Sequence, residues 1–391
     1  MDKVLTRFVV MNIRAGKDLL RKLLGERIYN LLSLVRRTAY ISDCISYHFI
    51  RWRVLSYYGK WAPLSERSVC NDRKMPHILM LAEKWSSGNP LHGPCSVDWV
   101  FFGSLEASGL ATYVRLNRDE HTNRYSFEKT ALGICMRKKP DLLFSTMWLV
   151  SSLDLKTLKV IRESLHIPVI ATWPDIENHV ETAEALVEFV DFNLVLNSVV
   201  APIRSQLRDI EKYIRLWSAF DPRVFYNANL KRDINVSFVG LRNGHPDREE
   251  GISVLKAHGI EVYVSGGKEE KTRLSVEEYA AIYRRSKIAL NFCYHANGIF
   301  QLKGRVFEAT SCGSMLMETE NPETAKYFEP MIDYVPFSDN KDLVDKVRYY
   351  LAHDDEREEI AANGHRKVTE KYNCRIFWQK VLDKALGKKS Q

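Results

Sequence analysis

The segment QLKGRVFEATSCGSMLMETE, residues 301–320, decides how this chain folds. An apolar run, KIALNF at residues 287–292, precedes it, and a second apolar run, SMLME at residues 314–318, lies near its end. Both runs are typical of buried strands. The residues between them predict a short helix from Gly304 to the Cys-Gly pair at 312–313, where glycine suits the left-handed residue that ends a helix. The sequence therefore predicts a strand–loop–helix–strand unit.

Such a unit places a helix N-terminus at the carboxyl edge of a parallel sheet, where free N–H groups and the helix dipole attract anions. Arg305 and Glu308 lie three residues apart, on one face of the predicted helix. We expect Arg305 to meet a phosphate and Glu308 to accept hydrogen bonds from sugar hydroxyls, as in a nucleotide-sugar site. A surface ion pair between the two side chains is the alternative interpretation of this spacing.

The composition is that of a globular protein with room for two cores. The chain has 391 residues, of which 45% are apolar and 27% charged. Its seven cysteines are scattered without a C-x-x-C pair, which favours reduced thiols over disulfides or structural zinc. No apolar run reaches the ~18 residues of a membrane-spanning helix, and the N-terminus lacks the apolar core of a signal peptide. We expect a cytoplasmic protein.

Positive charge is concentrated at the start of the chain. Residues 1–74 hold 15 of the 57 lysines and arginines but only 6 of the 49 acidic residues. Leucines at helical spacing, cations and aromatic residues predict a basic helical extension that binds an anionic membrane surface. Packing of these helices on the protein is one alternative. Nucleic acid is another, but no nucleic-acid-binding motif accompanies the charge, and we predict no nucleic-acid partner.

From residue 75 onward, apolar strands alternate with helices, which predicts parallel sheets covered on both faces. The run YIRLWSAFDPRVFYN at residues 213–227 interrupts the alternation, and the Asp-Pro pair within it indicates an interdomain linker. We predict one domain at residues 75–215 and a second at residues 228–375.

The run GRVFEATSCGSMLMETENPETAKYFE, residues 304–329, resembles the C-terminal half of GT-B glycosyltransferases. Its R-x-F-E and Cys-Gly pattern is most similar to the spore-maturation CgeB-like group. The resemblance implies an α/β fold of two doubly wound, Rossmann-like domains facing a central cleft, an acceptor domain followed by a nucleotide-sugar domain. It also implies that residues 376–391 form a helix that returns to the first domain.

Several polar residues on the second domain are candidates for binding the donor. The turn GLRNGHPD at residues 240–247 follows a predicted strand, and its glycines allow close approach of a phosphate. The candidates for binding the donor are Arg242, Arg248, Asn291, His295, Lys303, Gly304, Arg305 and Glu308. The chain contains no Asp-x-Asp, so we predict neither a metal nor any cofactor beyond the nucleotide-diphosphate-sugar substrate.

The catalytic base is predicted on the first domain. TWPDIENH, residues 172–179, ends a predicted strand, and we favour Asp175 within it, with His92 in a glycine-containing loop as the second candidate. Glu177 and His179 are weaker candidates, and capping of the next helix is an alternative role for Asp175. Retaining enzymes of this broad class carry two glutamates. Glu308 matches the second, but Phe300 stands in the place of the first, so the sequence predicts neither retention nor inversion.

Together these features predict a metal-independent glycosyltransferase that moves a sugar from a nucleotide-diphosphate-sugar to a glycan, lipid-linked or protein acceptor. The basic extension suggests peripheral association with the inner face of the membrane. A non-catalytic GT-B-like protein recruited to membranes is the alternative. A nicotinamide-dependent oxidoreductase is a third hypothesis, disfavoured because no predicted strand ends in G-x-G-x-x-G.

Overall fold

The computed structural model describes residues 75–196, 201–204, 206–242, 245–266, 274–293 and 299–387. The chain divides into two compact units, Met1–Val69 and Cys70–Gln391, and every described residue belongs to the second unit. The predicted basic helical extension therefore lies outside the described residues. So does His295, one of the residues predicted to bind the donor.

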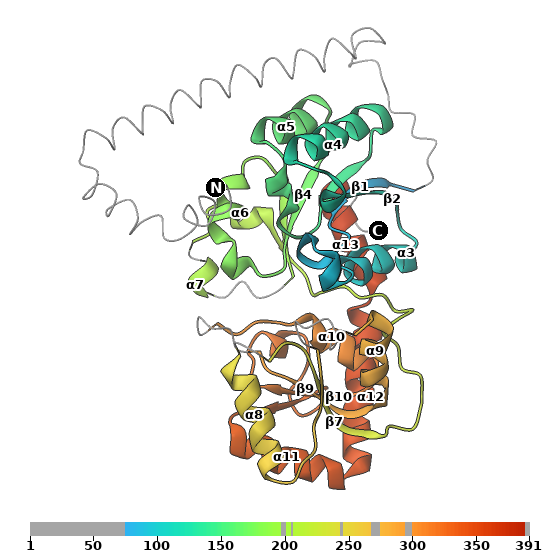
Figure 1. Ribbon diagram of the computed structural model, residues 1–391, viewed down its shortest axis with the longest axis vertical. Coiled ribbons are helices and arrows are strands. Elements are labelled where there is room, and N and C mark those ends of the chain that lie inside the picture. The colour runs from blue at the N-terminus through green and yellow to red at the C-terminus, as the bar shows by residue number, and fades with distance from the viewer. Residues whose placement is uncertain are drawn as a thin grey trace, which may run out of the picture. The chain divides into compact units, whose positions relative to one another are not determined.

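Two parallel sheets organise the second unit (Figure 1). The six-stranded sheet has the order β2-β1-β3-β4-β5-β6, and we call it and its helices the first lobe. Its strands are β1 His77–Ala82, β2 Thr112–Asn117, β3 Leu142–Ser145, β4 Val169–Trp173, β5 Phe192–Val195 and β6 Tyr213–Arg215. The five-stranded sheet has the order β11-β10-β9-β7-β8, and we call it and its helices the second lobe. Its strands are β7 Ile234–Val239, β8 Tyr263–Ser265, β9 Ser286–Asn291, β10 Met315–Thr319 and β11 Val335–Phe337.

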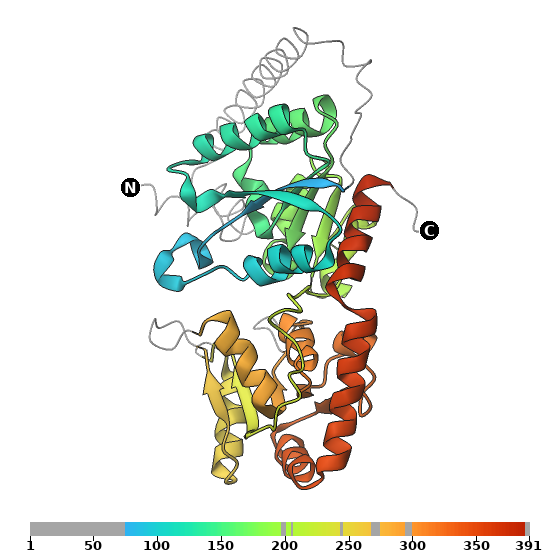
Figure 2. The ribbon, with the colours of Figure 1, turned by 90° about the vertical axis from the view of Figure 1, so that its right-hand side faces the viewer.

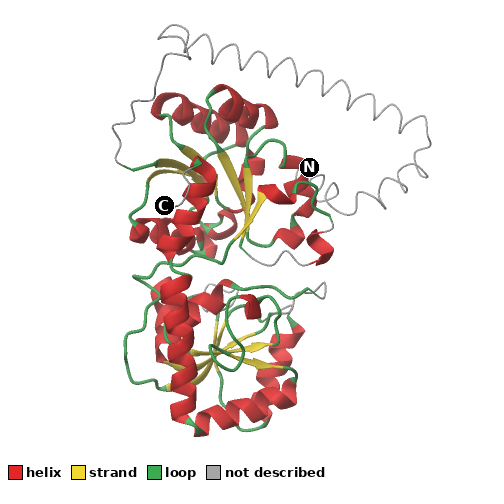
Figure 3. Ribbon diagram, turned by 180° about the vertical axis from the view of Figure 1, so that it is seen from behind, coloured by secondary structure: helices red, strands yellow, loops and turns green. Residues whose placement is uncertain are grey.

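Apolar residues on both faces explain why these strands are buried between helices (Figures 2 and 3). Along β1, Ile78 and Met80 enter one core cluster whereas Leu79 and Leu81 enter another, as the two-residue period of a strand requires. The α-helices that cover the sheets are α3 Ser104–Ser108, α4 Arg124–Lys138, α5 Leu155–Lys159, α6 Val180–Leu186, α7 Ala201–Arg204, α8 Pro246–Ala257, α9 Val276–Arg285, α10 Gly304–Ser311, α11 Asn340–Ala352, α12 Asp354–Lys371 and α13 Cys374–Leu386. Within the described residues, no helix is both long and apolar enough to cross a bilayer.

The strand order of the second lobe creates a switch point. The chain passes from β7 outward to β8 and then returns to the other side of β7 as β9. Connections on opposite sides of two neighbouring parallel strands leave a crevice at their carboxyl ends, where ligands bind in such sheets. The residues that follow β7 and β9 are therefore placed at the expected edge.

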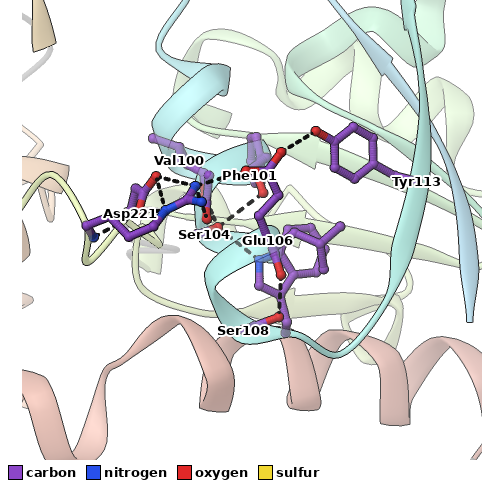
Figure 4. Close-up of polar contacts among 11 residues, drawn as sticks. Val100, Phe101, Ser104, Glu106, Ser108, Tyr113 and Asp221 are labelled. Atoms are coloured by element: carbon purple, nitrogen blue, oxygen red, sulfur yellow. Dashed lines mark hydrogen bonds and ion pairs between the residues drawn. The ribbon is translucent and has the colours of Figure 1, made fainter. Parts of the chain in front are cut away.

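The last helix and the linker join the two lobes. Trp378 of α13 donates from Nε1 to Ser104 Oγ of α3 over 2.9 Å, and its ring packs at 5.2 Å from that of Phe144. Asp221 of the linker is buried against Gly103, where a Cβ atom would lie only 2.2 Å from Asp221 Oδ2. Figure 4 shows Asp221 beside the α3 region, with Glu106 accepting a hydrogen bond from the Tyr113 hydroxyl. The linker thus needs a residue without a side chain at position 103.

Most predicted elements match the structure within a few residues, but two strands were missed. Residues 213–215 were assigned to the linker, yet they form β6 because they pair in parallel with β5. The short strand β11 pairs with β10 at the far edge. Both are three-residue edge strands, too short for a sequence pattern to predict.

Candidate functional site

The candidate site begins where β7 ends. Gly240 follows β7 with a φ of 154°, and its N–H donates to the Ser265 carbonyl over 2.9 Å. A Cβ atom on Gly240 would lie 2.9 Å from Nη2 of Arg305. Glycine at this position therefore lets the guanidinium of Arg305 lie directly against the backbone at the sheet edge.

Two arginines lie together at this edge. The guanidinium carbons of Arg248 and Arg305 are 5.9 and 5.4 Å from the centre of the Phe238 ring. Arg305 Nη1 donates to Asn291 Oδ1 over 3.0 Å, and Arg248 Nη1 donates to the Leu241 carbonyl over 2.7 Å. Neither arginine forms an ion pair within the described part of the chain.

Four cationic or titratable side chains influence one another here, and we call them the cation cluster: His245, Arg248, Lys303 and Arg305. Burial and the nearby charge of Arg305 lower the pKa of Arg248 to about 10. Burial, Arg248, Lys303 and Arg305 lower the pKa of His245, and burial with both arginines lowers that of Lys303. Asp247 opposes the fall in pKa for Arg248 and His245, and Asp175 and Glu177 oppose it for Lys303, but burial and the mutual repulsion of the cations prevail. A concentration of positive charge of this kind favours binding of an anion.

Helix N-termini add to this positive potential. Lys303 is the N-cap of α10 and His245 the N-cap of α8, and neither residue caps its helix with a side-chain hydrogen bond. The first N–H groups of a helix lack intrahelical acceptors and carry a partial positive charge. The predicted anion-binding end of α10 thus coincides with the cation cluster.

The first lobe contributes a carboxylate opposite α10. A cavity of about 220 Å³ is lined by residues of both lobes, among them Asp175 after β4 and Lys303 and Gly304 at the start of α10. The negative charge of Asp175 acts on Lys303 by raising its pKa against the stronger effect of burial. Asp175 makes no capping hydrogen bond, so the alternative interpretation as a helix cap is wrong. Gln301 Nε2 lies 3.5 Å from Asp175 Oδ1.

Glu308 connects the lobes rather than pairing with Arg305. It is 7% exposed, and its Oε1 accepts a hydrogen bond of 3.2 Å from Trp99 Nε1 of the first lobe. Its Oε2 accepts a hydrogen bond from the Tyr279 hydroxyl of α9. Burial raises the pKa of Glu308, and these two donors and Arg305 oppose the rise. The surface ion pair considered from the sequence is not formed.

The other predicted residues fall in different places. Asn291 is fully buried at the end of β9, between Arg305 and Glu318. The Arg242 side chain is exposed. His92 is exposed in its loop, where Nδ1 lies 3.2 Å from the Ser86 carbonyl oxygen, and it does not line the cavity.

Of the weaker base candidates, His179 stacks on Trp148 with ring centres 4.9 Å apart. Burial lowers its pKa, an effect that Asp175 opposes.

Sequence reasoning missed His245, Trp99 and Tyr279. His245 stands in the glycine-containing turn that the sequence had already indicated, so its position at a helix start was a usable sign. Trp99 lies in a π-helical segment, Asp98–Gly103, of a kind often found at functional sites. Sequence spacing does not reveal the contact between Trp99 and Glu308, which are 209 residues apart. It does not reveal the contact between Tyr279 and Glu308 either.

Comparison with known proteins agrees with this architecture. Residues 243–383 match the family model described as glycosyl transferase-like. Comparison with curated protein sequences gives no match. Among solved structures, HepE of Anabaena in complex with UDP and glucose has a TM-score of 0.53 at 10% identity, covering 79% of this chain and 98% of that one.

Two further solved structures have the same fold. Sucrose-phosphate synthase of Thermosynechococcus elongatus has a TM-score of 0.54 at 13% identity, covering 80% of this chain and 99% of that one. The BGT protein of phage T4 with its UDP-glucose substrate has a TM-score of 0.51 at 13% identity, with coverage of 80% and 100%.

The fold is therefore GT-B, as predicted, with two parallel α/β sheets and flanking helices. The match to the glycosyl transferase-like family model lies on residues 243–383, which include most of the second lobe and α13. The non-catalytic alternative is not favoured.

Proposed function

We propose that this protein transfers a sugar from a nucleoside-diphosphate-sugar to a hydroxyl group of a glycan, lipid-linked or protein acceptor. One observation carries the proposal: the cation cluster lies at the switch point of the second sheet, and Arg248 and Arg305 form no ion pair with any described carboxylate. Neighbours with the same fold are described with UDP and with UDP-glucose, so a uridine donor is the first to test.

In this proposal the cation cluster binds the diphosphate. Arg248 and Arg305 face its oxygens, while Lys303 and the first N–H groups of α10 neutralise the charge that grows as the diphosphate leaves. Glu308 accepts hydrogen bonds from the ribose hydroxyls, for which each carboxylate oxygen retains a free lone pair beside its present donor. No metal ion is needed for this binding.

Transfer forms one bond and breaks another. An acceptor oxygen bonds to the anomeric carbon of the donor, the bond from that carbon to the diphosphate oxygen breaks, and the diphosphate leaves with the electron pair. We assign the acceptor proton to Asp175, which lines the cavity with Lys303 and Gly304. Gln301 Nε2 lies 3.5 Å from this carboxylate, and the charge of Lys303 at the start of α10 interacts with it.

The finer features of the proposal come from the sequence. The R-x-F-E and Cys-Gly pattern supports a place in the CgeB-like group, and the charge of residues 1–74 supports an acceptor at or near the inner face of a membrane. A surface polysaccharide or a lipid-linked glycan fits such a location.

Calorimetric titration with UDP, UDP-glucose and inorganic pyrophosphate tests the proposal. We expect micromolar binding of UDP that persists in EDTA, and a loss of at least about tenfold for Arg305→Gln, the effect of one charge-assisted hydrogen bond. Arg285→Gln, which removes an exposed ion pair with Asp233, is the control. Glu308→Gln should weaken UDP but not pyrophosphate. The proposal is wrong if the wild-type protein binds no nucleotide or nucleotide-sugar, and loss of binding in EDTA would refute metal independence.

A further inference from the structure

A buried polar network lies beneath the cation cluster. Asn291 and Glu318 are partners across the parallel strands β9 and β10, so their side chains lie on the same face of the sheet. Both residues are fully buried, and Asn291 Nδ2 donates to Glu318 Oε1 over 2.7 Å. Asn321, 3% exposed, donates to the same oxygen over 3.4 Å. A carboxyl group at this depth is costly to bury and calls for a reason.

The chemistry of these groups allows only one orientation of the Asn291 amide. Arg305 can only donate hydrogen bonds, so the Asn291 oxygen must face it. The Asn291 nitrogen must then face Glu318, which accepts its hydrogen bond. Glu318 therefore holds the amide with its oxygen directed at the guanidinium, and rotation of the amide by half a turn would break both hydrogen bonds.

Arg305 depends on this amide for its position. The single side-chain hydrogen bond of Arg305 within the described residues is the one to Asn291 Oδ1, and its guanidinium also lies near the Phe238 ring and Gly240. Glu308 and Glu318 act on it by charge, without an ion pair. Ring and backbone contacts restrict the guanidinium to a slot but do not fix the direction of its N–H groups. The hydrogen bond that Arg305 donates to Asn291 is its one directional restraint in the described part of the chain.

We propose that Glu318 is a positioning residue of the donor site, which acts through Asn291 to aim Arg305 at the diphosphate. The inference rests on the proposed function and extends it, because Glu318 touches no substrate itself. Sequence reasoning placed Glu318 within a buried strand and gave it no role.

Inorganic pyrophosphate is the probe, because it reports the diphosphate site independently of the nucleotide. Glu318→Leu keeps the apolar packing of β10 but leaves Asn291 unanchored, and we expect its affinity for pyrophosphate to fall by about tenfold, the value of one directional hydrogen bond to a charged group. Glu318→Gln retains the Oε1 acceptor and should stay within about threefold of the wild-type protein. Burial raises the pKa of Glu318 to about 7, so glutamine mimics a well-populated neutral form.

A double-mutant cycle separates positioning from general destabilisation. If Glu318 acts through Arg305, Glu318→Leu has no further effect on pyrophosphate affinity in an Arg305→Ala background. Asp333→Leu is the matched control: Asp333 is 5% exposed in the same lobe and pairs with Lys367, so its loss should lower stability but not affinity. If Glu318→Leu does not fold, Asn291→Ala removes the same link and enters the same cycle.

The outcomes distinguish the two proposals. A wild-type protein that binds neither pyrophosphate nor UDP overturns the proposed function and this inference with it. A wild-type protein that binds pyrophosphate while Glu318→Leu binds it equally well overturns the positioning role alone. An equal loss in the presence and absence of Arg305, or a loss in Glu318→Gln as large as in Glu318→Leu, also overturns it.

Discussion

Replacement of Arg248 by methionine should make the protein more stable and a poorer binder of diphosphate. Arg248 is 4% exposed, donates one hydrogen bond to the Leu241 carbonyl, and leaves its Nε buried without a partner in the described residues. Arg305 repels it, and this repulsion outweighs the attraction of Asp247. Methionine fills a similar volume without a charge. Arg248→Met therefore removes the free-energy cost of burying the guanidinium, and with it the group that binds the diphosphate.

The lowered pKa of Arg248 gives the size of the effect. The fall of this pKa from the ordinary value of an arginine to about 10 corresponds to roughly 3 kcal/mol, at about 1.4 kcal/mol for each pH unit. A base whose pKa is lowered by folding destabilises the folded state below both pKa values, and this penalty disappears only as the pH rises from about 10 toward the ordinary pKa of an arginine. At pH 7 it is fully present. Arg248→Met should therefore raise the free energy of unfolding by about 1–3 kcal/mol, after some loss of packing.

Urea unfolding at pH 7 measures this change, because urea, unlike guanidinium, does not screen charge. Calorimetry with UDP on the same samples should show a loss of affinity of at least about tenfold. Arg357 provides a matched control in the same lobe, being 2% exposed but paired with Asp354 and Glu358. Arg357→Met should destabilise the protein and leave UDP affinity unchanged, since it removes two ion pairs and leaves the buried Tyr350 carbonyl without its donor.

The opposite pattern would refute the reasoning. If Arg248→Met unfolds more readily than the wild-type protein by more than about 1 kcal/mol and still binds UDP normally, Arg248 is a structural residue. A gain in stability without a loss of binding would place the diphosphate elsewhere on the second lobe.

Two further predictions concern the geometry of the site. Gly240→Ala should weaken UDP binding by about tenfold, because the new Cβ would lie 2.9 Å from Nη2 of Arg305. Gly259→Ala is the control, since Gly259 also has a positive φ but its Cβ would have nothing within 4 Å, and this variant should bind UDP normally. Equal affinities for the two variants would contradict the argument. Asp175→Asn should lower kcat by about 100-fold or more with little change in KM for the donor; a change confined to KM would show that Asp175 binds substrate rather than accepting its proton.

Much of the fold was predictable because the apolar strands are long and their helices begin and end at recognisable residues. The prediction for residues 301–320 holds in detail: α10 runs from Gly304 to Ser311, and Gly313 has a φ of 75°. The edge strands β6 and β11 were not predictable, because pairing with a neighbour makes them strands and three residues carry no period.

The site was predictable where a local rule applies and not where distant segments meet. The turn after β7 and the start of α10 follow from the strand–helix pattern, so Arg248, Lys303 and Arg305 could be proposed from sequence. The contact of Trp99 with Glu308 joins two lobes, and the pairing of Asn291 with Glu318 depends on strand register. Neither relation leaves a trace in one sequence, because it is set by packing between elements far apart along the chain.

The second lobe itself shows that burial alone does not explain the cation cluster. Where an arginine serves the fold, it has several partners: Arg232 donates to four backbone carbonyls, and Arg357 pairs with two carboxylates and donates to the Tyr350 carbonyl, although its Nε has no partner in the described residues. Arg248 and Arg305 each have one hydrogen bond in the described residues, and they lie together at the switch point of the sheet. Folding gains nothing from charges left this way. A bound diphosphate would supply the acceptors that both arginines lack. The protein is then less stable without a ligand because its site is arranged to bind an anion.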